Sequence, residues 1–535
     1  MKRPSSIALA TPTILLPIIL TIILAAACAP VPVAERPGQG AAPSATTSGG
    51  PEQGSGAAVP AAGKQPLSGL EFPVVTRHES RFNDKPLPYT ATVGAIEVND
   101  VEGKPGARVV SIAYVAETGP YAAGRPVMFV FNGGPISPSV YLHMGAFGPK
   151  RVAFADDLSA DVATAPLVDN PHSLLDVTDL VFFDPAGTGF SRTLPGKPLE
   201  DYFSVSADAQ QTASFIASWL DQHGRRASPV YIFGESYGTN RAVETARQLA
   251  ELPQPVLLDG VVLFGQAVNI IEYAQRPDNI ISYAVSLPTL AALGWYHGKA
   301  ETGGADLERF VASAWEYART EYLQALFQGA ALPEDRLREV ARRLAGFSGL
   351  PAELFVARRL RVSKEDYRVE LFREEGLVIG RSDGRYVGPA KAEGDGEGAS
   401  PPDPAAALPR ALAAAFLAYA VAELGVPSTE QYVIDSPVRG LDGWDWGERT
   451  PFSRFAYGDS LDVLLDKNPR ARVLVTAGYF DTMTTTGASL YLVNQESWPA
   501  ERVTLAFYRG GHMAYSIDDN ARKMADDLRA WISPP

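Results

Sequence analysis

Hydrophobic and polar residues alternate along two early stretches, residues 89–98 and 107–115, with turn-forming residues between them. Such alternation is typical of half-buried antiparallel strands. Later apolar runs are short and almost uninterrupted, as in fully buried strands of a mostly parallel sheet. These runs occupy residues 126–132, 178–184, 228–234, 258–265, 471–478 and 502–511. Helical periodicity fills 206–224 and 239–253 between them, so the pattern predicts a doubly wound α/β sheet flanked by helices.

The alternation of strands and helices stops between about residues 271 and 431. Helical periods occupy 305–327 and 333–349, and residues 376–388 have the pattern of a hairpin. We interpret residues 271–431 as one mainly helical cap insertion. It divides a single α/β core into a first part, 69–270, and a second part, 432–535.

The N-terminus has the features of an export signal. Lys2 and Arg3 precede an apolar run over residues 7–28, which resembles a secretory signal peptide. The run ends in three alanines and Cys28, the only cysteine of the chain, and this resembles the lipobox of a bacterial lipoprotein. Residues 29–68 are rich in Pro, Gly, Ala and Ser and are typical of a flexible tether. We therefore expect a signal peptide over 1–28, lipidation at Cys28, and a membrane-anchored enzyme of the cell envelope, in the periplasm or at the cell surface.

Charge and composition exclude several other classes. The net charge is −14 and no basic stripe is present, which argues against nucleic-acid binding. One cysteine and six scattered histidines give no metal-ligand cluster, so we expect neither a metal nor an organic cofactor.

A Gly-x-Ser-x-Gly motif over residues 234–238 follows a predicted buried strand and precedes a predicted helix. A sharp strand-to-helix turn exposes the serine hydroxyl, and the helix N-terminus offers N–H groups to an oxyanion. This context favours Ser236 as a nucleophile over a serine in an ordinary turn.

A nucleophilic serine needs a base and an acid, which follow it in the chain order of α/β-hydrolases. Only His297 and His512 follow Ser236, and His512 alone comes directly after a predicted strand. Asp481 follows the strand before that and is the favoured acid, to hold the imidazole in one tautomer. Asp459 and Asp462 are the alternatives, but neither follows a strand.

Several segments together resemble the serine carboxypeptidase family, in the order in which that family carries them. They are FVFNGGPISPS, GAFGP, NPHSLLDVTDLVFFDPAGTGFS, YIFGESYG, LVTAGYFD and GGHM. The resemblance implies an α/β-hydrolase fold and a triad of Ser236, Asp481 and His512. It also implies an oxyanion hole formed by the backbone N–H groups of Gly134 and Tyr237.

The same resemblance assigns Asn132 and Glu235 to binding of the substrate's terminal carboxylate. A buried glutamate beside a carboxylate has to be protonated to donate to it, which favours acid pH. A second glutamate of the family is replaced by Ala146. Arg241, in the first turn after the nucleophile, is a candidate for a charge-assisted replacement, and the alternative is a solvated helix residue.

Three functional hypotheses follow. The first is a serine-type carboxypeptidase that removes C-terminal residues from peptides through an acyl-enzyme. The second is an esterase or acyltransferase that uses the same triad. The third, least favoured because all three triad members are present, is a catalytically silent binding protein on a hydrolase scaffold.

Overall fold

The computed structural model describes residues 70–117, 124–155, 158, 161–391, 401–438, 440–447, 453, 455 and 457–532. The predictions for the signal peptide, for Cys28 and for the tether lie outside these residues. The chain divides into two units, residues 1–49 and 50–535, and every described residue belongs to the second.

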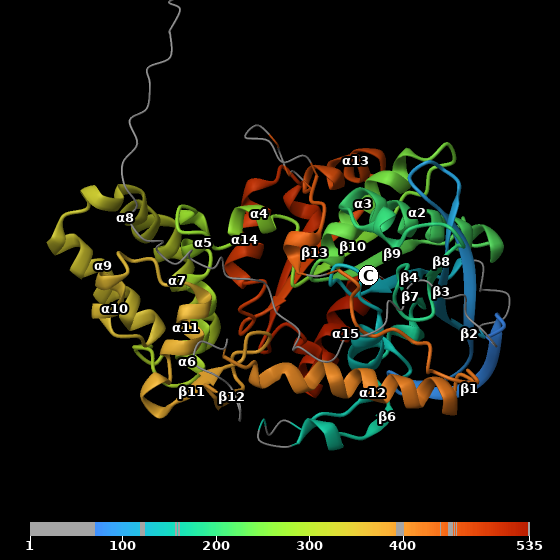
Figure 1. The fold of residues 1–535 in the computed structure, drawn as a ribbon, viewed down its shortest axis with the longest axis horizontal. Coiled ribbons are helices and arrows are strands. Elements are labelled where there is room, and N and C mark those ends of the chain that lie inside the picture. Colours follow the sequence, from blue (N-terminus) through green and yellow to red (C-terminus); the bar gives the residue numbers. More distant parts are fainter. Residues whose placement is uncertain are drawn as a thin grey trace, which may run out of the picture. The chain divides into compact units, whose positions relative to one another are not determined.

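A ten-stranded sheet forms the centre of the second unit (Figure 1). Along its main path the order is β1-β2-β3-β7-β4-β9-β10-β13-β14, and β8 pairs with β3. The strands are β1 Val74–Phe82, β2 Lys85–Asn99, β3 Pro105–Ala116, β4 Val127–Phe131, β7 Asp179–Phe183, β8 Arg192–Thr193, β9 Val230–Glu235, β10 Gly260–Phe264, β13 Arg472–Gly478 and β14 Val503–Tyr508. From β7 to β14 all pairs are parallel, whereas β1, β2 and β3 join as antiparallel strands.

Side chains of the central strands alternate between two hydrophobic cores, one on each face of the sheet. In β4, for example, Met128 and Val130 enter one core and Phe129 enters the other. The first core is completed by α12 Ala407–Ala422 and α15 Asp518–Ile532, and the second by α2 Val205–Gln222, α3 Gly238–Glu251, α13 Asp459–Lys467 and α14 Thr486–Gln495. Figure 1 shows the two groups of helices on opposite sides of the sheet. This mostly parallel sheet between helices is the α/β-hydrolase fold, and the predicted fold class is confirmed.

The predicted strands are all present, but one of them differs in its environment. We expected β14 to be fully buried, and that expectation is wrong: β14 is the edge strand, and Leu505 is 39% exposed. Strand β1 has no counterpart among the predicted strands, because its residues alternate without a strongly apolar run.

The chain between β10 and β13 forms the helical region that the sequence indicated. Its helices are α4 Ile270–Tyr273, α5 Ile280–Ala284, α6 Leu287–Tyr296, α7 Leu307–Tyr317, α8 Leu323–Gln328, α9 Glu334–Ser348, α10 Ala352–Ala357 and α11 Lys364–Glu370. A third hydrophobic core joins most of them. The predicted hairpin is present as β11 Leu377–Ile379 and β12 Val387–Pro389, paired antiparallel. Two further short strands, β5 Lys150–Val152 and β6 Leu167–Asp169, form a separate pair.

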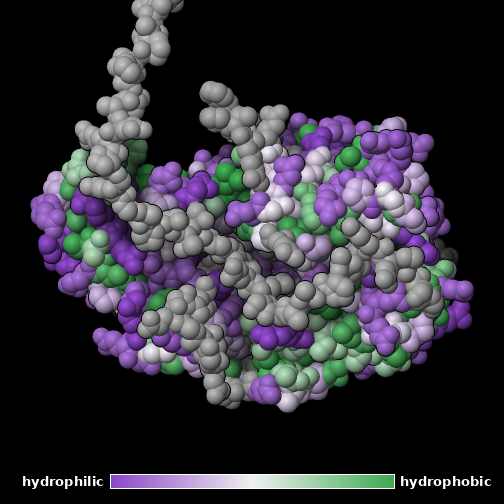
Figure 2. Space-filling view, in the orientation of Figure 1, coloured by the Kyte–Doolittle hydropathy of each residue, from purple (hydrophilic) through white to green (hydrophobic). Residues whose placement is uncertain are grey.

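Helix α12 closes this region and is unusually apolar. The stretch Pro404–Ala422 is long and apolar enough to cross a membrane by length and composition alone. Its large side chains Leu412, Phe416 and Tyr419 are already buried in the first core of the sheet. Figure 1 shows this helix along the lower side of the molecule, above β6, and Figure 2 shows hydrophobic residues among polar ones in that region. Its exposed positions are mostly alanine, and the helix is anchored to the protein's own core.

Candidate active site

Ser236 occupies the tight turn between β9 and α3, as predicted. Its φ is +59°, the left-handed region that non-glycine residues rarely adopt. Its N–H donates to the Phe264 carbonyl at 2.9 Å, at the end of the neighbouring strand. A Cβ on Gly234 would lie 2.3 Å from the carbonyl oxygen of Gly238, so the motif needs glycine for this turn to close.

His512 and Asp481 form a hydrogen-bonded pair on the loops that follow β14 and β13. Nδ1 of His512 and Oδ2 of Asp481 are 2.7 Å apart, and the Asp481 side chain is fully buried. The other oxygen of Asp481 accepts the N–H groups of Met483 and Thr484 at 2.7 and 3.1 Å, and the Thr484 hydroxyl donates to Oδ2 at 2.5 Å. With so many donors the carboxylate has one orientation, facing the imidazole.

This environment also sets the charge of the imidazole. Burial by itself lowers the pKa of His512, but the Asp481 carboxylate outweighs burial and raises that pKa to about 9. The nearby carboxyl of Glu235 adds to the increase. The pair therefore stabilises an imidazolium, the form that a general base acquires when it accepts a proton.

Ser236 and His512 both lie at the end of β10. Ser236 bonds to Phe264, and the next residue, Gly265, packs on the imidazole: a Cβ there would lie 3.2 Å from Cε1 of His512. The Ser236 hydroxyl forms no hydrogen bond with any residue that the structure describes. Catalytic hydrogen bonds of unliganded enzymes are commonly open in this way and tighten when substrate binds.

The loop before the short helix α1 Val140–Leu142 packs directly on the nucleophile turn. A Cβ on Gly133 would lie 2.5 Å from the Tyr237 nitrogen and 2.7 Å from the Glu235 carbonyl oxygen. The next residue, Gly134, has φ +109°. Within the described part of the chain, neither the Gly134 nor the Tyr237 N–H donates a hydrogen bond. Two unpaired N–H groups thus adjoin Ser236, which is what an oxyanion hole requires.

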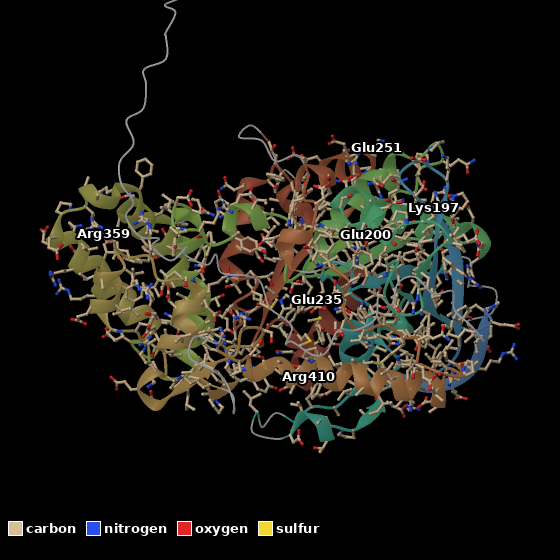
Figure 3. All side chains as sticks on the ribbon, in the orientation of Figure 1. Lys197, Glu200, Glu235, Glu251, Arg359 and Arg410 are labelled. Carbon is tan, nitrogen blue, oxygen red and sulfur yellow. The ribbon has the colours of Figure 1, made fainter. Side chains whose placement is uncertain are left out.

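Glu235 lies inside the core beside the nucleophile, near the centre of the molecule in Figure 3. It is 2% exposed. Its Oε2 accepts from Nδ2 of Asn132, and the Tyr515 hydroxyl lies 3.1 Å from both carboxyl oxygens. Burial raises the pKa of Glu235 to about 7, although the positive His512 opposes the increase. The predicted pair of Asn132 and Glu235 is therefore brought together, with a carboxyl that can be neutral below neutral pH.

Arg241 has a different environment from the one we expected. Its side chain is fully buried, and Nε donates to Asp208 Oδ2 at 2.8 Å in an equally buried ion pair. Its NH1 donates to the Asn132 carbonyl at 2.8 Å, and the guanidinium lies 5.2 Å from the Phe131 ring centre. These contacts argue against binding of a substrate carboxylate by Arg241, because its charge is already paired and out of reach. They make it a support for the end of β4.

The remaining candidates belong to other elements or lack a polar side chain. Ala146 is 3% exposed and offers only its carbonyl, which accepts from Asn170 at 2.8 Å. The alternative base His297 bonds to the Gly384 carbonyl in the cap. Asp459 and Asp462 lie in α13, against the opposite core from α15.

Two polar residues of the site were missed from the sequence. Tyr515 and Thr484 each follow a predicted triad residue by three positions, Tyr515 after His512 and Thr484 after Asp481. For Thr484 the spacing was the available signal, since a turn brings residue i+3 close to residue i. Tyr515 bonds to Glu235, 280 positions away, and its spacing from His512 gave no such signal.

Comparison with known proteins agrees with part of this interpretation. Residues 114–252 match the model of the serine carboxypeptidase family. The match includes the segment with Asn132, Gly134 and Ser236, and it ends before Asp481 and His512. No curated protein sequence matches the chain.

Among solved structures, similarity is found to a prohormone-processing carboxypeptidase, Kex1Δp of Saccharomyces cerevisiae. The two chains are 13% identical with a TM-score of 0.48, over 83% of this chain and 90% of the other. A proline iminopeptidase of Mycobacterium smegmatis is 14% identical with a TM-score of 0.34, over 82% and 97%. An esterase of Thermogutta terrifontis is 14% identical with a TM-score of 0.31, over 82% and 97%. The family match over residues 114–252, taken with the fold, indicates a serine hydrolase.

Proposed function

We propose that this protein is a serine carboxypeptidase that removes C-terminal residues from peptides through an acyl-enzyme. The observation that carries the proposal is the buried pair of His512 and Asp481, 2.7 Å apart, beside Ser236 on its left-handed turn. A serine hydroxyl becomes nucleophilic when a neighbouring base accepts its proton as it attacks.

In the first half of the reaction, Ser236 Oγ attacks the scissile carbonyl while Nε2 of His512 accepts the hydroxyl proton. The oxyanion that forms is stabilised by the N–H groups of Gly134 and Tyr237, each worth about 3 kcal/mol in comparable sites. The imidazolium then donates the same proton to the leaving amine, the C–N bond breaks, and an acyl-enzyme remains on Ser236.

Water completes the cycle by the reverse sequence of proton transfers. His512 accepts a proton from water as the oxygen attacks the acyl carbon. It returns that proton to Ser236 Oγ when the ester bond breaks, and the shortened peptide leaves as a carboxylic acid.

Recognition of the terminal carboxylate is assigned to Asn132 and Glu235. A protonated Glu235 can donate to the substrate carboxylate, and its pKa of about 7 makes the protonated form available in neutral and acid solution. The hydrogen bond from Asn132 holds the Glu235 carboxyl in place.

The esterase or acyltransferase hypothesis remains the second candidate for a specific reason. Ala146 contributes no acidic side chain, and Arg241 is held by Asp208 in the interior. If Asn132 and Glu235 alone do not recognise a carboxylate, the same acyl-enzyme would form from esters or other acyl donors.

The test compares an N-blocked dipeptide, its C-terminal amide and a simple ester of the same acyl group, with the soluble chain from residue 69. We expect cleavage of the free acid with a clear preference over the amide, and no cleavage by Ser236→Ala. Equal cleavage of acid and amide would point to a broader peptidase. Cleavage of the ester alone would replace the carboxypeptidase proposal with the esterase or acyltransferase one. A fluorophosphonate probe that labels Ser236→Ala as strongly as the native protein would refute Ser236 as nucleophile.

We also propose export and lipid anchoring through Cys28. The support is the charged start, the apolar run, and the single cysteine after three alanines. Expression in a bacterial host with a labelled fatty acid tests it: the native chain should carry the label in the membrane fraction, and Cys28→Ser should not.

A further inference from the structure

The cap reaches into the active site through one loop of its hairpin. Residues 381–384, within the connection between β11 and β12, are called the clamp loop below. On the base side, the His512 N–H donates to the Ser382 carbonyl at 2.6 Å. The Gly511 N–H donates to Asp383 Oδ2 at 3.2 Å. The backbone on which His512 is carried is therefore bonded to the cap.

The same loop binds the segment that carries the acid. The Gly384 N–H donates to the Phe480 carbonyl at 3.0 Å, and the Thr482 hydroxyl donates to the Arg381 carbonyl at 2.7 Å. These two partners are the residues immediately before and after Asp481. The clamp loop thus joins the two halves of the acid–base pair from outside the sheet.

The clamp loop is in close van der Waals contact with the loop after β14, which carries Gly511 and His512. A Cβ on Gly511 would lie 2.4 Å from both the Ser382 carbonyl oxygen and the Asp383 Cβ, so the approach requires glycine at 511. Asp383 is 3% exposed. With no room between the two loops, a shift of the clamp loop is passed directly to His512.

The clamp loop is itself held firmly by the cap. Arg385 Nε donates to Asp383 Oδ1 at 2.9 Å, and the Arg381 N–H donates to Asp403 at 2.9 Å. His297 Nε2, 2.8 Å from the Gly384 carbonyl, donates to it. Phe480, beside the acid, belongs to the hydrophobic core of the cap and lies 5.1 Å from the Tyr296 ring. The support is therefore rigid on the cap side as well.

We propose that the clamp loop sets the distance between His512 and Asp481, with Asp383 as its positioning residue. The inference rests on the proposed function, in which these two residues are base and acid. Asp383 touches no reacting atom: it acts on His512 through the Gly511 N–H. The bonds of the clamp loop fall on the residues adjoining both catalytic side chains and on His512 itself.

The test measures kcat and KM of Asp383→Ala on the best substrate found above, beside Asp383→Asn and a control, Asp306→Ala. Asp306 caps α7 through the Arg309 N–H, at 2.9 Å, so its loss destabilises the cap while every bond of the clamp loop is retained. We expect kcat of Asp383→Ala to fall about 100-fold, the usual effect of a displaced catalytic group, with KM within about twofold. Asp383→Asn, whose amide oxygen can still accept from Gly511, should recover about tenfold of that loss.

A second readout does not depend on turnover. The proton shared by His512 Nδ1 and Asp481 gives a low-field proton resonance that reports their separation. We expect this resonance to weaken or disappear in Asp383→Ala and to persist in Asp306→Ala.

The proposal is overturned if folded Asp383→Ala keeps kcat within about threefold of the native value, or if Asp306→Ala loses as much kcat at a similar Tm.

If Asp383→Ala does not fold, Thr482→Val removes the bond to Arg381 at nearly constant shape. A fall in its kcat of about tenfold at unchanged KM supports the clamp, and native kcat refutes it. If the native protein neither cleaves substrate nor binds the probe, the proposed function fails. The resonance then decides on the clamp by itself: its loss in Asp383→Ala supports the clamp, and its persistence there refutes it.

Discussion

Titration of Glu235 should switch the preference of this protein for substrates with a free carboxylate. The carboxyl lies beside Ser236, is buried, and has a pKa of about 7 because burial disfavours its charged form. Below that pKa it is protonated and, in the proposed role, would donate to the substrate's terminal carboxylate. Above it, a second negative charge faces the substrate, so binding of the free acid weakens as pH rises.

The size of the effect follows from that pKa. About 99% of Glu235 is protonated at about pH 5, about half at pH 7, and about 1% at about pH 9. Above neutrality, kcat/KM for the free acid should therefore fall about tenfold per pH unit relative to a substrate without a carboxylate. The substrate's own carboxyl, with a pKa near 3.5, stays ionised over this whole range.

The assay takes the ratio of kcat/KM for an N-blocked dipeptide to that for its C-terminal amide at each pH. His512 has a pKa of about 9, so both values of kcat/KM rise with pH as its imidazole becomes neutral. This effect is the same for both substrates and cancels in the ratio. We expect the ratio to be constant below about pH 6 and to fall by about 100-fold between pH 6 and pH 9.

The matched variant is Glu235→Gln, whose amide keeps the shape and donates at every pH. Its ratio of kcat/KM values should be independent of pH and close to the ratio that the native protein has in acid solution. A native ratio that does not change with pH would refute the role of Glu235 in carboxylate binding. The same conclusion would follow if the ratio in Glu235→Gln still fell above neutral pH.

Three other perturbations have definite expected results. Gly133→Ala would place a methyl group 2.5 Å from the Tyr237 nitrogen, so kcat/KM should fall about 100-fold or more while the far-UV spectrum is retained; a rate within about threefold of native would contradict the close packing of the two loops. Asp481→Asn should lower kcat about 10⁴-fold with little change in Tm, because the imidazole loses its preferred tautomer, and an active variant would exclude Asp481 as the acid. Arg241→Met leaves Asp208 buried and unpaired, and urea denaturation should show a loss of about 3–5 kcal/mol in the free energy of unfolding; a loss below about 1 kcal/mol would mean that the pair is not a support of the fold.

The sequence predicted the fold well where the residues of a segment by themselves indicate how that segment is buried. Uninterrupted apolar runs identified every parallel strand, since a strand buried on both faces has no polar position to spare. The run that became β14 has an apolar centre like the others, yet nothing within it distinguishes an edge strand from a central one. Whether a strand has one neighbour or two is decided by the rest of the sheet.

Residues of the site divided in the same way. Ser236, with its glycines and flanking elements, could be proposed from the local sequence. Chain order left His297 and His512 as bases, and the strand before His512 favoured the latter. Arg241 was misjudged because its partner Asp208 lies on another helix, 33 positions away. Asp383 was not considered at all, since its contact with Gly511 spans 128 positions and depends on how the cap lies against the sheet.

Helix α12 has a consequence for how enzymes of this architecture can be divided and recombined. By chain position it belongs to the region between β10 and β13, but Leu412, Phe416 and Tyr419 form part of a core of the sheet. The part of the chain that could be exchanged as a cap therefore does not include everything between β10 and β13, because α12 belongs to the α/β core. A hybrid that exchanges the segment only up to the start of α12 keeps the first core of the sheet intact. A hybrid that exchanges α12 as well has to repack that core along with the new cap.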